Sequence, residues 1–370
     1  MKYDVIVVGL GAMGSATVAQ CARRNQTVLG LERWTPGHRY GSSHGDSRII
    51  REMYFEHPMY VPLLQRAYEL WEEMGMLTNI NKGLMIGRED GMLVTGTLRS
   101  AQEHGLSHEV LSPREVKQRY PAFDLQHDLV AVVDPRAGWL DPERCNAEHL
   151  KIAARYGAEL RFEEPVTSWN ADENGVTVTT PYATYQADHL VLSVGACTSK
   201  LLNGLELPLE IERQVVFWLN TSGAEYEASQ FPIWAYEHTP GAITYGFPRL
   251  PKGVKASVMH GGETWSDSKN VNRSVHDGEI EPLRRALEPI LPSLSVAPVK
   301  ESDVCLFTNT PDHDFIIDWH PEFPRVLIST PCSGHGFKFA SVIGEIQSNL
   351  VSGGDKRFDL TPFSISRFKS

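Results

Sequence analysis

The chain has 370 residues, which is too long for one hydrophobic core and predicts two domains, or one domain with a large insertion. Its formal charge of −11 disfavours nucleic acid and anionic membranes as partners, and no apolar stretch approaches the roughly 20 residues that cross a bilayer. Five cysteines without paired spacing and the lack of a secretory signal predict a cytoplasmic protein with neither disulfides nor a zinc site.

The first predicted element is a buried strand that leads into a glycine-rich turn and a helix. "DVIVV" (4–8) suits a parallel strand, and Gly9, Gly11 and Gly14 then spell G-x-G-x-x-G. The first glycine permits the tight turn, the second lets the backbone approach a pyrophosphate, and the third lets helix and strand pack closely. The pattern predicts a dinucleotide site, although the glycines could also serve packing alone.

A second strand, "QTVLGLE", ends in Glu32, eighteen residues after Gly14. A carboxylate at this position can accept hydrogen bonds from ribose hydroxyls and would repel a 2′-phosphate, so NADP is not expected. These two strands do not separate NAD from FAD.

The next segment, residues 36–57, favours FAD. Its run of small residues suits a backbone that lies against a flat ring and phosphates, whereas an NAD enzyme would continue with another helix and strand. Arg48 and Arg51 are three apart, so on a helix they would share a face and require an anion or an electron-rich group between them. The alternative is a solvated basic face.

The middle of the chain is rich in strand signals. Residues 175–192 alternate and turn like a β-hairpin that leads into the buried strand "HLVLSVGACTS" (189–199). Residues 210–309 combine strand formers, aromatic residues and turn signals, which predicts an antiparallel sheet able to line a pocket.

Near the end, "RVLIST" and "PCSGHGFKFASVIGEI" predict a strand, a glycine turn and a helix. The helix N-terminus would stabilise negative charge placed beside it. Lys338 lies in the apolar run, where a buried cation is costly unless an anion pairs with it. The alternative is a lysine whose head reaches the surface.

Several separated motifs resemble the monomeric sarcosine oxidase and N-methyltryptophan oxidase family of amine-oxidising flavoproteins. The motifs are "VIVVGLGAMG", "GSSHGDSRIIR", "HLVLSVGACTSKLL", "TYGFP", "GVKASVMHGG", "VCLFTNTPDHDFIID", "SGHGFKFASVIGE" and "DLTPFSISRF". The resemblance runs over nearly the whole chain and implies an α/β fold, α+β overall. It implies a discontinuous, Rossmann-like FAD-binding domain of the glutathione-reductase type (1–83, 145–209 and 316–370) and an inserted substrate domain on an antiparallel sheet (84–144 and 210–315).

The resemblance implies FAD as the cofactor, bound covalently through a thioether from Cys305 to the flavin 8α-methyl. A nearby cation would help the thiolate, and Arg48 and His44 are candidates. From the residues alone Cys332 is a rival, and Cys305 could be a buried apolar filler. The remaining cofactor-binding residues implied are Gly9, Gly11, Met13, Gly14, Glu32, Arg33, Ser42, Ser43, Arg48, Val166, Gly195, Gly334, His335, Gly336 and Lys338.

The resemblance also implies a substrate site. Arg51 and Lys338 would hold the carboxylate of an amino-acid substrate, with Tyr245 in the pocket. Lys255 would activate oxygen, unless it is a surface lysine on an edge strand. His335 is expected to fix its loop by hydrogen bonding, and Asp318 to hold the turn near the cofactor.

The chain departs from the family at two pocket positions. Met259 stands where the relatives carry a histidine, and His260, one residue later, would face the other side of the strand. Phe307 stands where the sarcosine enzyme carries a tyrosine. Both changes make the pocket less polar and suggest a bulkier or more apolar amine than sarcosine.

The function implied is FAD-dependent oxidation of a secondary amine, an N-methyl amino acid or a cyclic imino acid, by hydride transfer to flavin N5. The imine would hydrolyse and O2 would reoxidise the flavin to give H2O2. The expected partners are an amine substrate with a carboxylate and O2; no metal is expected, and the protein is expected to be a monomer. Three alternatives stay open: a dehydrogenase that passes electrons to a carrier, a non-catalytic FAD-binding protein, and a nicotinamide dehydrogenase.

Overall fold

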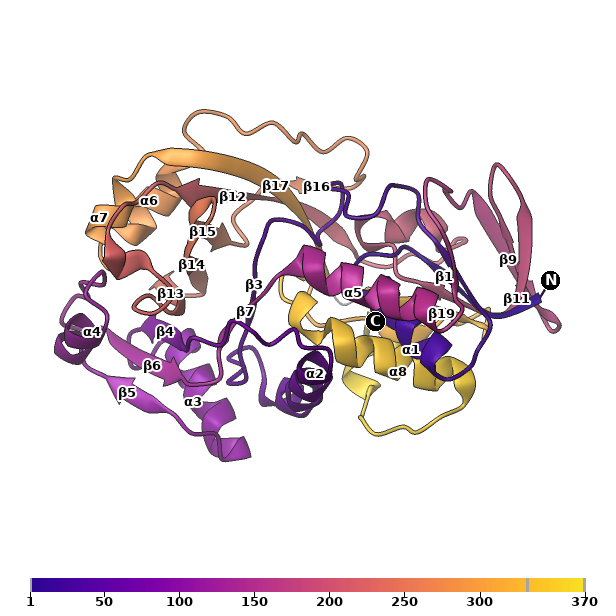
Figure 1. Ribbon diagram of the computed structural model, residues 1–370, viewed down its shortest axis with the longest axis horizontal. Helices are drawn as coiled ribbons and strands as arrows, with labels where there is room; N and C mark the ends of the chain where they lie inside the picture. Colours follow the sequence, from indigo (N-terminus) through magenta and orange to yellow (C-terminus); the bar gives the residue numbers. More distant parts are fainter. Residues whose placement is uncertain (1, 331–332, 369–370) are drawn as a thin grey trace.

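The computed structural model describes residues 2–330 and 333–368, and most of its strands belong to two large sheets (Figure 1). The first sheet has a parallel centre in which short apolar strands are buried, as expected when both faces are covered. Its strands, in order across the sheet, are β18 (Ile317–Trp319), β19 (Val326–Ser329), β11 (Thr184–Leu192), β1 (Lys2–Val8), β2 (Val28–Leu31) and β8 (Glu159–Arg161).

Three helices cover this sheet: α1 (Ala12–Arg23), α5 (Pro142–Arg155) and α8 (Ala340–Ser352). Helix α1 packs between the other two, as Figure 1 shows. The hairpin expected over residues 175–192 is confirmed, because β10 (Gly175–Thr179) pairs antiparallel with β11 and with β9 (Ser168–Asp172). The α/β class of the chain and its Rossmann-like first sheet are therefore as predicted.

The second sheet has nine strands. They are β16 (Thr264–Trp265), β12 (Glu210–Leu219), β15 (Gly253–Met259), β14 (Ala242–Leu250), β13 (Ile233–Thr239), β4 (Gly83–Gly87), β6 (Val130–Asp134) and β5 (Glu109–Leu111) in order, with β17 (Val299–Asn309) paired to β12. The neighbours are antiparallel except β13 and β4, which confirms the antiparallel sheet predicted over residues 210–309.

Four further helices lie at the end of the molecule that carries the second sheet (Figure 1). They are α3 (Met92–His104), α4 (Pro113–Arg119), α6 (Glu281–Leu287) and α7 (Pro292–Ser295). Strand β4 begins at Gly83, so the second sheet starts one residue before the expected limit of the substrate domain. The exact domain limits stay a prediction. None of the helices within the described residues is long and apolar enough to span a membrane.

A short ribbon of β3 (Arg48–Ile50) and β7 (Gly138–Leu140) lies between the two sheets (Figure 1). The expectation that Arg48 and Arg51 share a helix face is therefore wrong. Ile49 and Ile50 follow Arg48, and β-branched residues favour a strand that can pair, as here with Trp139 and Gly138. Arg51 begins the loop after the ribbon.

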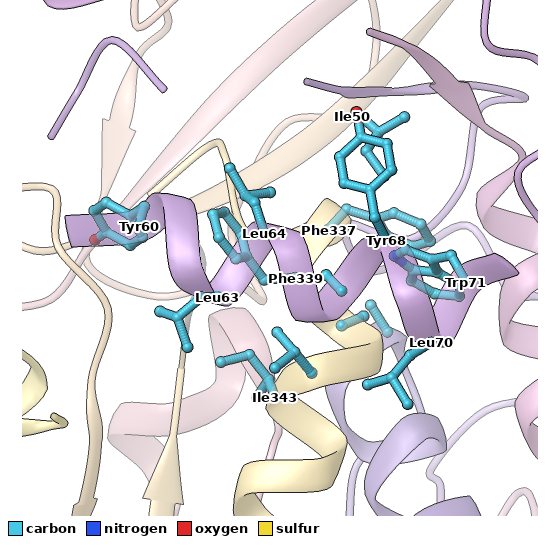
Figure 2. Close-up of a cluster of buried hydrophobic side chains, with 14 of the residues drawn as sticks. Ile50, Tyr60, Leu63, Leu64, Tyr68, Leu70, Trp71, Phe337, Phe339 and Ile343 are labelled. Carbon is cyan, nitrogen blue, oxygen red and sulfur yellow. The ribbon is translucent and has the colours of Figure 1, made fainter. Parts of the chain in front are cut away.

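Helices α2 (Val61–Glu73) and α8 bury a shared apolar cluster, in which Phe337 and Phe339 meet the aromatic and aliphatic side chains of α2 (Figure 2). These phenylalanines belong to a 3-10 turn, Phe337–Phe339, that directly precedes α8. Trp71 Nε1 donates a hydrogen bond of 2.8 Å to the carbonyl oxygen of Lys338. The backbone on both sides of Lys338 is therefore anchored in the cluster.

Candidate active site

A long cavity of about 1090 Å³ lies over the carboxyl ends of β1 and β2. Open α/β sheets bind their ligands at this edge. Most of the predicted cofactor-binding residues line the cavity: Gly9, Gly11, Met13, Glu32, Arg33, Ser42, Ser43, Arg48, Val166, Gly195, Gly334 and Gly336. Lys200, Lys269 and Arg273 line it too and were not predicted from the sequence: Lys200 lies within the motif of residues 189–202 but was not singled out there, and the other two lie outside every motif.

The glycine motif forms a turn that side chains would block. Gly9 has a φ of +87°, which is the left-handed region, and a Cβ on Gly14 would lie 1.7 Å from the carbonyl oxygen of Gly9. Gly14 therefore lies beneath the cavity, while Gly11, Ala12 and Met13 at the start of α1 line it. The turn and the helix N-terminus together can receive a phosphate group.

Replacing Gly14 by alanine is expected to weaken cofactor binding at least tenfold and to lower the melting temperature. The clash is with backbone, so α1 must shift from β1, and overpacking of this kind costs about 1–3 kcal/mol. Flavin absorbance per protein and the Kd for added FAD measure the effect. Ser15→Ala on the same helical turn is the control, because it adds no atoms and removes a buried hydroxyl that donates to the carbonyl of Ala12 and lies 3.5 Å from His149 Nδ1. Full flavin content in Gly14→Ala would contradict the assignment.

Glu32 remains ionised at the edge of the cavity. Its carboxylate accepts hydrogen bonds from the N–H groups of Leu10 (2.9 Å) and Trp34 (3.1 Å), and His38 Nε2 lies 3.6 Å away. Burial raises the pKa of Glu32, but His38 and these N–H groups lower it further, so the net shift is downward. A charged acceptor at this position fits the predicted contact with ribose hydroxyls.

A second, smaller cavity of about 90 Å³ adjoins the first. Arg48, Phe307, Gly334 and Phe337 line both cavities, so the two meet at these residues. The second cavity gathers most of the predicted substrate-site and oxygen-site residues: Arg51, Tyr245, Lys255, Met259, Cys305, His335 and Lys338. A flat ring at the junction would contact groups that the sequence separates widely.

Arg51 and Lys338 both reach the second cavity, and both are buried. Tyr54 lies beneath them, with its ring centroid 4.2 Å from Arg51 Cζ and 5.2 Å from Lys338 Nζ. Lys338 Nζ donates to the carbonyl oxygen of His335 at 2.7 Å. Burial, and then the charge of Arg51, lowers the pKa of Lys338 to about 7. Two buried cations side by side create a strong demand for an anion.

Glu56 is an anion that pairs with one of these two cations. It was not identified from the sequence. Arg51 Nη2 donates to Glu56 Oε1 at 2.7 Å, and Glu56 lines the second cavity. Burial raises the pKa of Glu56, but the charges of Arg51 and Lys338 lower it by more, so it is a carboxylate. The signal available in the sequence was an acid five residues after Arg51, which is too common a pattern to single out.

Lys255 lies on β15, in the interior of the second sheet between β12 and β14, so the alternative of a surface lysine on an edge strand is wrong. Its side chain is 2% exposed, and Nζ donates to the carbonyl oxygens of Gly45 (2.6 Å) and Ser47 (2.9 Å). Burial, and then the charge of Arg48, lowers the pKa of Lys255 to about 7. Among the described residues no carboxylate pairs with this ammonium, so its charge is available to stabilise a negative charge that develops nearby.

Cys305 lies on β17 at the edge of the second cavity, 3% exposed. Its Sγ is 3.6 Å from Arg48 Nη2 and 3.8 Å from His44 Nε2. Burial raises the pKa of this thiol, but Arg48, His44 and Lys255 lower it to about 6. A thiolate of this kind differs from an inert apolar filler. The rival Cys332 lies outside the described residues.

His44 lines neither cavity and instead lies behind Cys305. Its short loop turns the imidazole inward, where the side chain is 1% exposed, and so brings it beside the sulfur that it was expected to assist. Any effect of His44 on a bound group must pass through the Cys305 sulfur.

The positions that depart from the family face the second cavity. Met259 and Phe307 line it together with Tyr245, whose pKa burial raises to about 12, so this phenol is neutral. His260 turns away as predicted, and its Nδ1 lies 3.0 Å from Glu212 Oε2. The wall opposite the two cations is therefore largely apolar.

His335 holds its loop, as expected. Its Nε2 lies 2.9 Å from the carbonyl oxygen of His313, and because a carbonyl only accepts, the proton is on Nε2 and Nδ1 accepts from the Tyr54 hydroxyl. Burial lowers the pKa of His335 to about 4, so the ring is neutral. The expected role of Asp318 is wrong: its Oδ2 accepts from Ser364 Oγ (2.7 Å) and the Ile365 N–H (2.8 Å), so it holds the C-terminal segment.

Comparison with known proteins identifies the family of the chain. The family profile described as "FAD dependent oxidoreductase" matches residues 4–350. The chain is 41% identical to monomeric sarcosine oxidase of Streptomyces avermitilis, over 95% of this chain and 94% of that protein. It is 32% identical to N-methyl-L-tryptophan oxidase of Yersinia pestis over the full length of both.

Solved structures share the fold at lower identity. NikD, described as an unusual amino acid oxidase essential for nikkomycin biosynthesis, aligns with a TM-score of 0.82 at 24% identity over 98% of this chain and 97% of its own. L-proline dehydrogenase from P. horikoshii aligns with a TM-score of 0.86 at 19% identity over 100% and 98%. These two likenesses establish the fold.

Proposed function

The chain belongs to the family of FAD-dependent oxidoreductases, and we propose that it oxidises a secondary amine that carries a carboxylate, an N-methyl amino acid or a cyclic imino acid. The observation that carries this proposal is the pair of buried cations, Arg51 and Lys338, at the end of a cavity suited to a dinucleotide. The named activities of the sarcosine and N-methyltryptophan oxidases at 41% and 32% identity support it.

The residues of the first cavity fit FAD. The Gly9–Gly14 turn and the start of α1 would receive the pyrophosphate, Glu32 the ribose, and Val166 the adenine through its backbone. The cavity continues to the junction beside Arg48 and Gly334, where the isoalloxazine would lie. Bound there, FAD would supply the hydride acceptor at N5 and the reduced ring that dioxygen reoxidises.

Arg51 and Lys338 would hold the substrate carboxylate and so fix the carbon that loses its hydride. Glu56 is hydrogen-bonded to Arg51 and must give way, because two carboxylates at the same guanidinium repel. The same cations disfavour a protonated amine, so the substrate nitrogen is held in the neutral form that hydride loss requires. The imine product would leave and hydrolyse in water.

Lys255 would act on the oxygen half of the reaction. Its ammonium is fixed by the carbonyls of Gly45 and Ser47, beside the second cavity. A fixed positive charge stabilises superoxide as the first electron moves to O2, and H2O2 is the final product.

Cys305 would carry FAD through a thioether to the 8α carbon. The thiolate character imposed by Arg48 and His44 supports this attachment. Acid precipitation tests it: yellow colour in the pellet is the expected result, and a colourless pellet from a yellow protein would overturn it. We also propose that the protein is a monomer and lies in the cytoplasm. The monomeric state is proposed because the sarcosine oxidase relative is named as monomeric.

A substrate panel tests the activity. N-methyl amino acids, proline analogues and larger secondary amines are mixed anaerobically with the holoenzyme, and bleaching of the flavin band is followed. We expect faster bleaching with substrates that carry an apolar side chain than with sarcosine, because Met259 and Phe307 line the second cavity. Fast bleaching with slow reoxidation by O2 would favour the carrier-linked dehydrogenase. Bleaching by none of the panel would favour a non-catalytic FAD-binding protein.

A further inference from the structure

We infer that Asp303 is a positioning residue that holds His44 against the Cys305 sulfur and thereby controls attachment of the flavin. Asp303, His44 and Cys305 form a carboxylate–imidazole–thiol relay that ends at the cavity junction. The inference rests on the proposed attachment through Cys305 and adds to it a residue that contacts neither cavity.

The relay is built from two segments of the chain. Asp303 and Cys305 are two residues apart on β17, so their side chains lie on the same face of the strand. His44 fits between them, with Nδ1 3.3 Å from Asp303 Oδ2 and Nε2 3.8 Å from Cys305 Sγ. Within the described residues His44 Nδ1 has no hydrogen bond of good geometry, so the ion pair with Asp303 fixes that edge of the ring.

The carboxylate is itself held from the outside. Arg39 Nη2 donates to Asp303 Oδ2 at 2.6 Å, and the N–H of Val304 donates to Oδ1 at 2.8 Å. Asp303 therefore cannot rotate away from His44 without losing both contacts. In hydrolytic triads a carboxylate in this position orients the imidazole and stabilises its protonated form, and the same logic applies to a thiol.

The surrounding charges support this arrangement. The contacts with Asp303 and Cys305 outweigh burial and raise the pKa of His44 to about 9, and His44 in turn helps to lower the pKa of Asp303 to about 2. Arg48, whose Nη2 lies 3.6 Å from Cys305 Sγ, and Lys255 also lower the pKa of Cys305. Without Asp303 a third cation beside Arg48 and Lys255 would be disfavoured, so His44 would lose its proton and the thiolate would lose a donor.

The attachment step balances with dioxygen as the oxidant. A bond forms between Cys305 Sγ and the flavin 8α carbon, and one methyl C–H bond breaks, with its proton released. The two electrons reduce the isoalloxazine, and O2 then accepts two electrons and two protons to give one H2O2. A thiolate is the attacking species, so the rate follows the fraction of Cys305 that is ionised.

The test uses the full chain purified without flavin from riboflavin-limited cells and then mixed with FAD in air. Acid-stable flavin and the mass of the Cys305 peptide are followed with time. Attachment is measured at about pH 5, below the pKa of about 6 of Cys305, where each unit by which the thiol pKa rises lowers the thiolate fraction about tenfold. We expect Asp303→Asn to slow attachment about tenfold under this condition. Asp303→Glu restores part of the rate.

Glu301→Gln is the matched control. Glu301 lies two residues before Asp303, on the same face of β17, and also contacts Arg39, at 3.7 Å, but not His44. The variant removes the same charge from the same strand, and its attachment rate is expected to equal that of the parent. A slowed Glu301→Gln would show that loss of any nearby carboxylate suffices and would overturn the relay.

A second readout separates positioning from folding. The pH dependence of iodoacetamide alkylation at Cys305 in the flavin-free chain is expected to move upward in Asp303→Asn. An unchanged midpoint and an attachment rate equal to that of the parent would overturn the role of Asp303 while leaving the proposed function intact. A parent chain that retains no acid-stable flavin would instead overturn the attachment itself, and the relay with it.

Discussion

Replacement of Lys255 by methionine is expected to slow reoxidation of the reduced flavin by O2 roughly 100- to 1,000-fold, because one fixed charge at a developing anion is worth about that factor. Flavin reduction by substrate should change less than about tenfold, since Lys255 Nζ donates to the carbonyls of Gly45 and Ser47, whereas Arg51 and Lys338 are the residues proposed to hold the substrate. Stopped-flow mixing measures the halves separately: anaerobic bleaching by substrate, then mixing of the reduced enzyme with O2.

Lys255→Arg is the matched control for charge. It should keep most of the reoxidation rate, because the proposed role of Lys255 requires a positive charge and does not require proton transfer from the side chain. The pKa of Lys255 is lowered to about 7 by burial and by Arg48, so the reoxidation rate should fall as the pH rises through that region. Equal reoxidation by the methionine and parent enzymes would remove the assigned role.

Lys255→Met should also stabilise the folded state. The unfolded chain keeps the Lys255 proton up to its ordinary pKa of about 10.4, whereas the folded state releases it near 7. Between these values the unfolded state binds more protons, so the free energy of unfolding contributed by Lys255 rises with pH. Below pH 7 the penalty of a buried charge is fully present, and there Lys255→Met should show its largest increase in melting temperature.

The sequence predicted well those features that are encoded locally. The Gly9–Gly14 turn, the acid at the end of β2 and the hairpin before β11 each depend on neighbours in the chain, and each appears as expected. Spacing failed where tertiary pairing decides: Arg48 and Arg51 fit a helix by their separation, but the isoleucines between them pair with β7. Local periodicity cannot report a partner strand that lies far along the chain.

Other residues of the site become neighbours only in the folded chain. Asp303 reaches His44 because β17 lies beside the loop that follows β2, and Glu56 reaches Arg51 because the loop after β3 folds back. Neither acid stands in a distinctive motif. The burial of Lys255 could not be predicted either. Its strand is interior because of the order of the strands in the sheet, and that order cannot be read from the sequence.

Replacement of Arg51 by methionine is expected to lower kcat/KM for an N-methyl amino acid roughly 100-fold or more. Loss of one partner of a buried charge pair costs about 2–5 kcal/mol, and Lys338 alone would have to hold the carboxylate. The methyl amide of the same amino acid should be nearly insensitive, since it brings no carboxylate. Steady-state kinetics give, for each compound, the ratio of kcat/KM between the parent enzyme and Arg51→Met. Equal losses on the two compounds would contradict the carboxylate contact.

Glu56→Gln should act in the opposite direction and so isolates the contact further. Glu56 is hydrogen-bonded to Arg51 at 2.7 Å, and its carboxylate competes for the cation that the substrate needs. Removing that charge should lower KM for the amino acid and leave the methyl amide unchanged, while the fold keeps an isosteric side chain. A general loosening of the site would raise KM in both variants. Opposite signs from two residues in contact can arise only if a substrate carboxylate takes the place of Glu56 on Arg51.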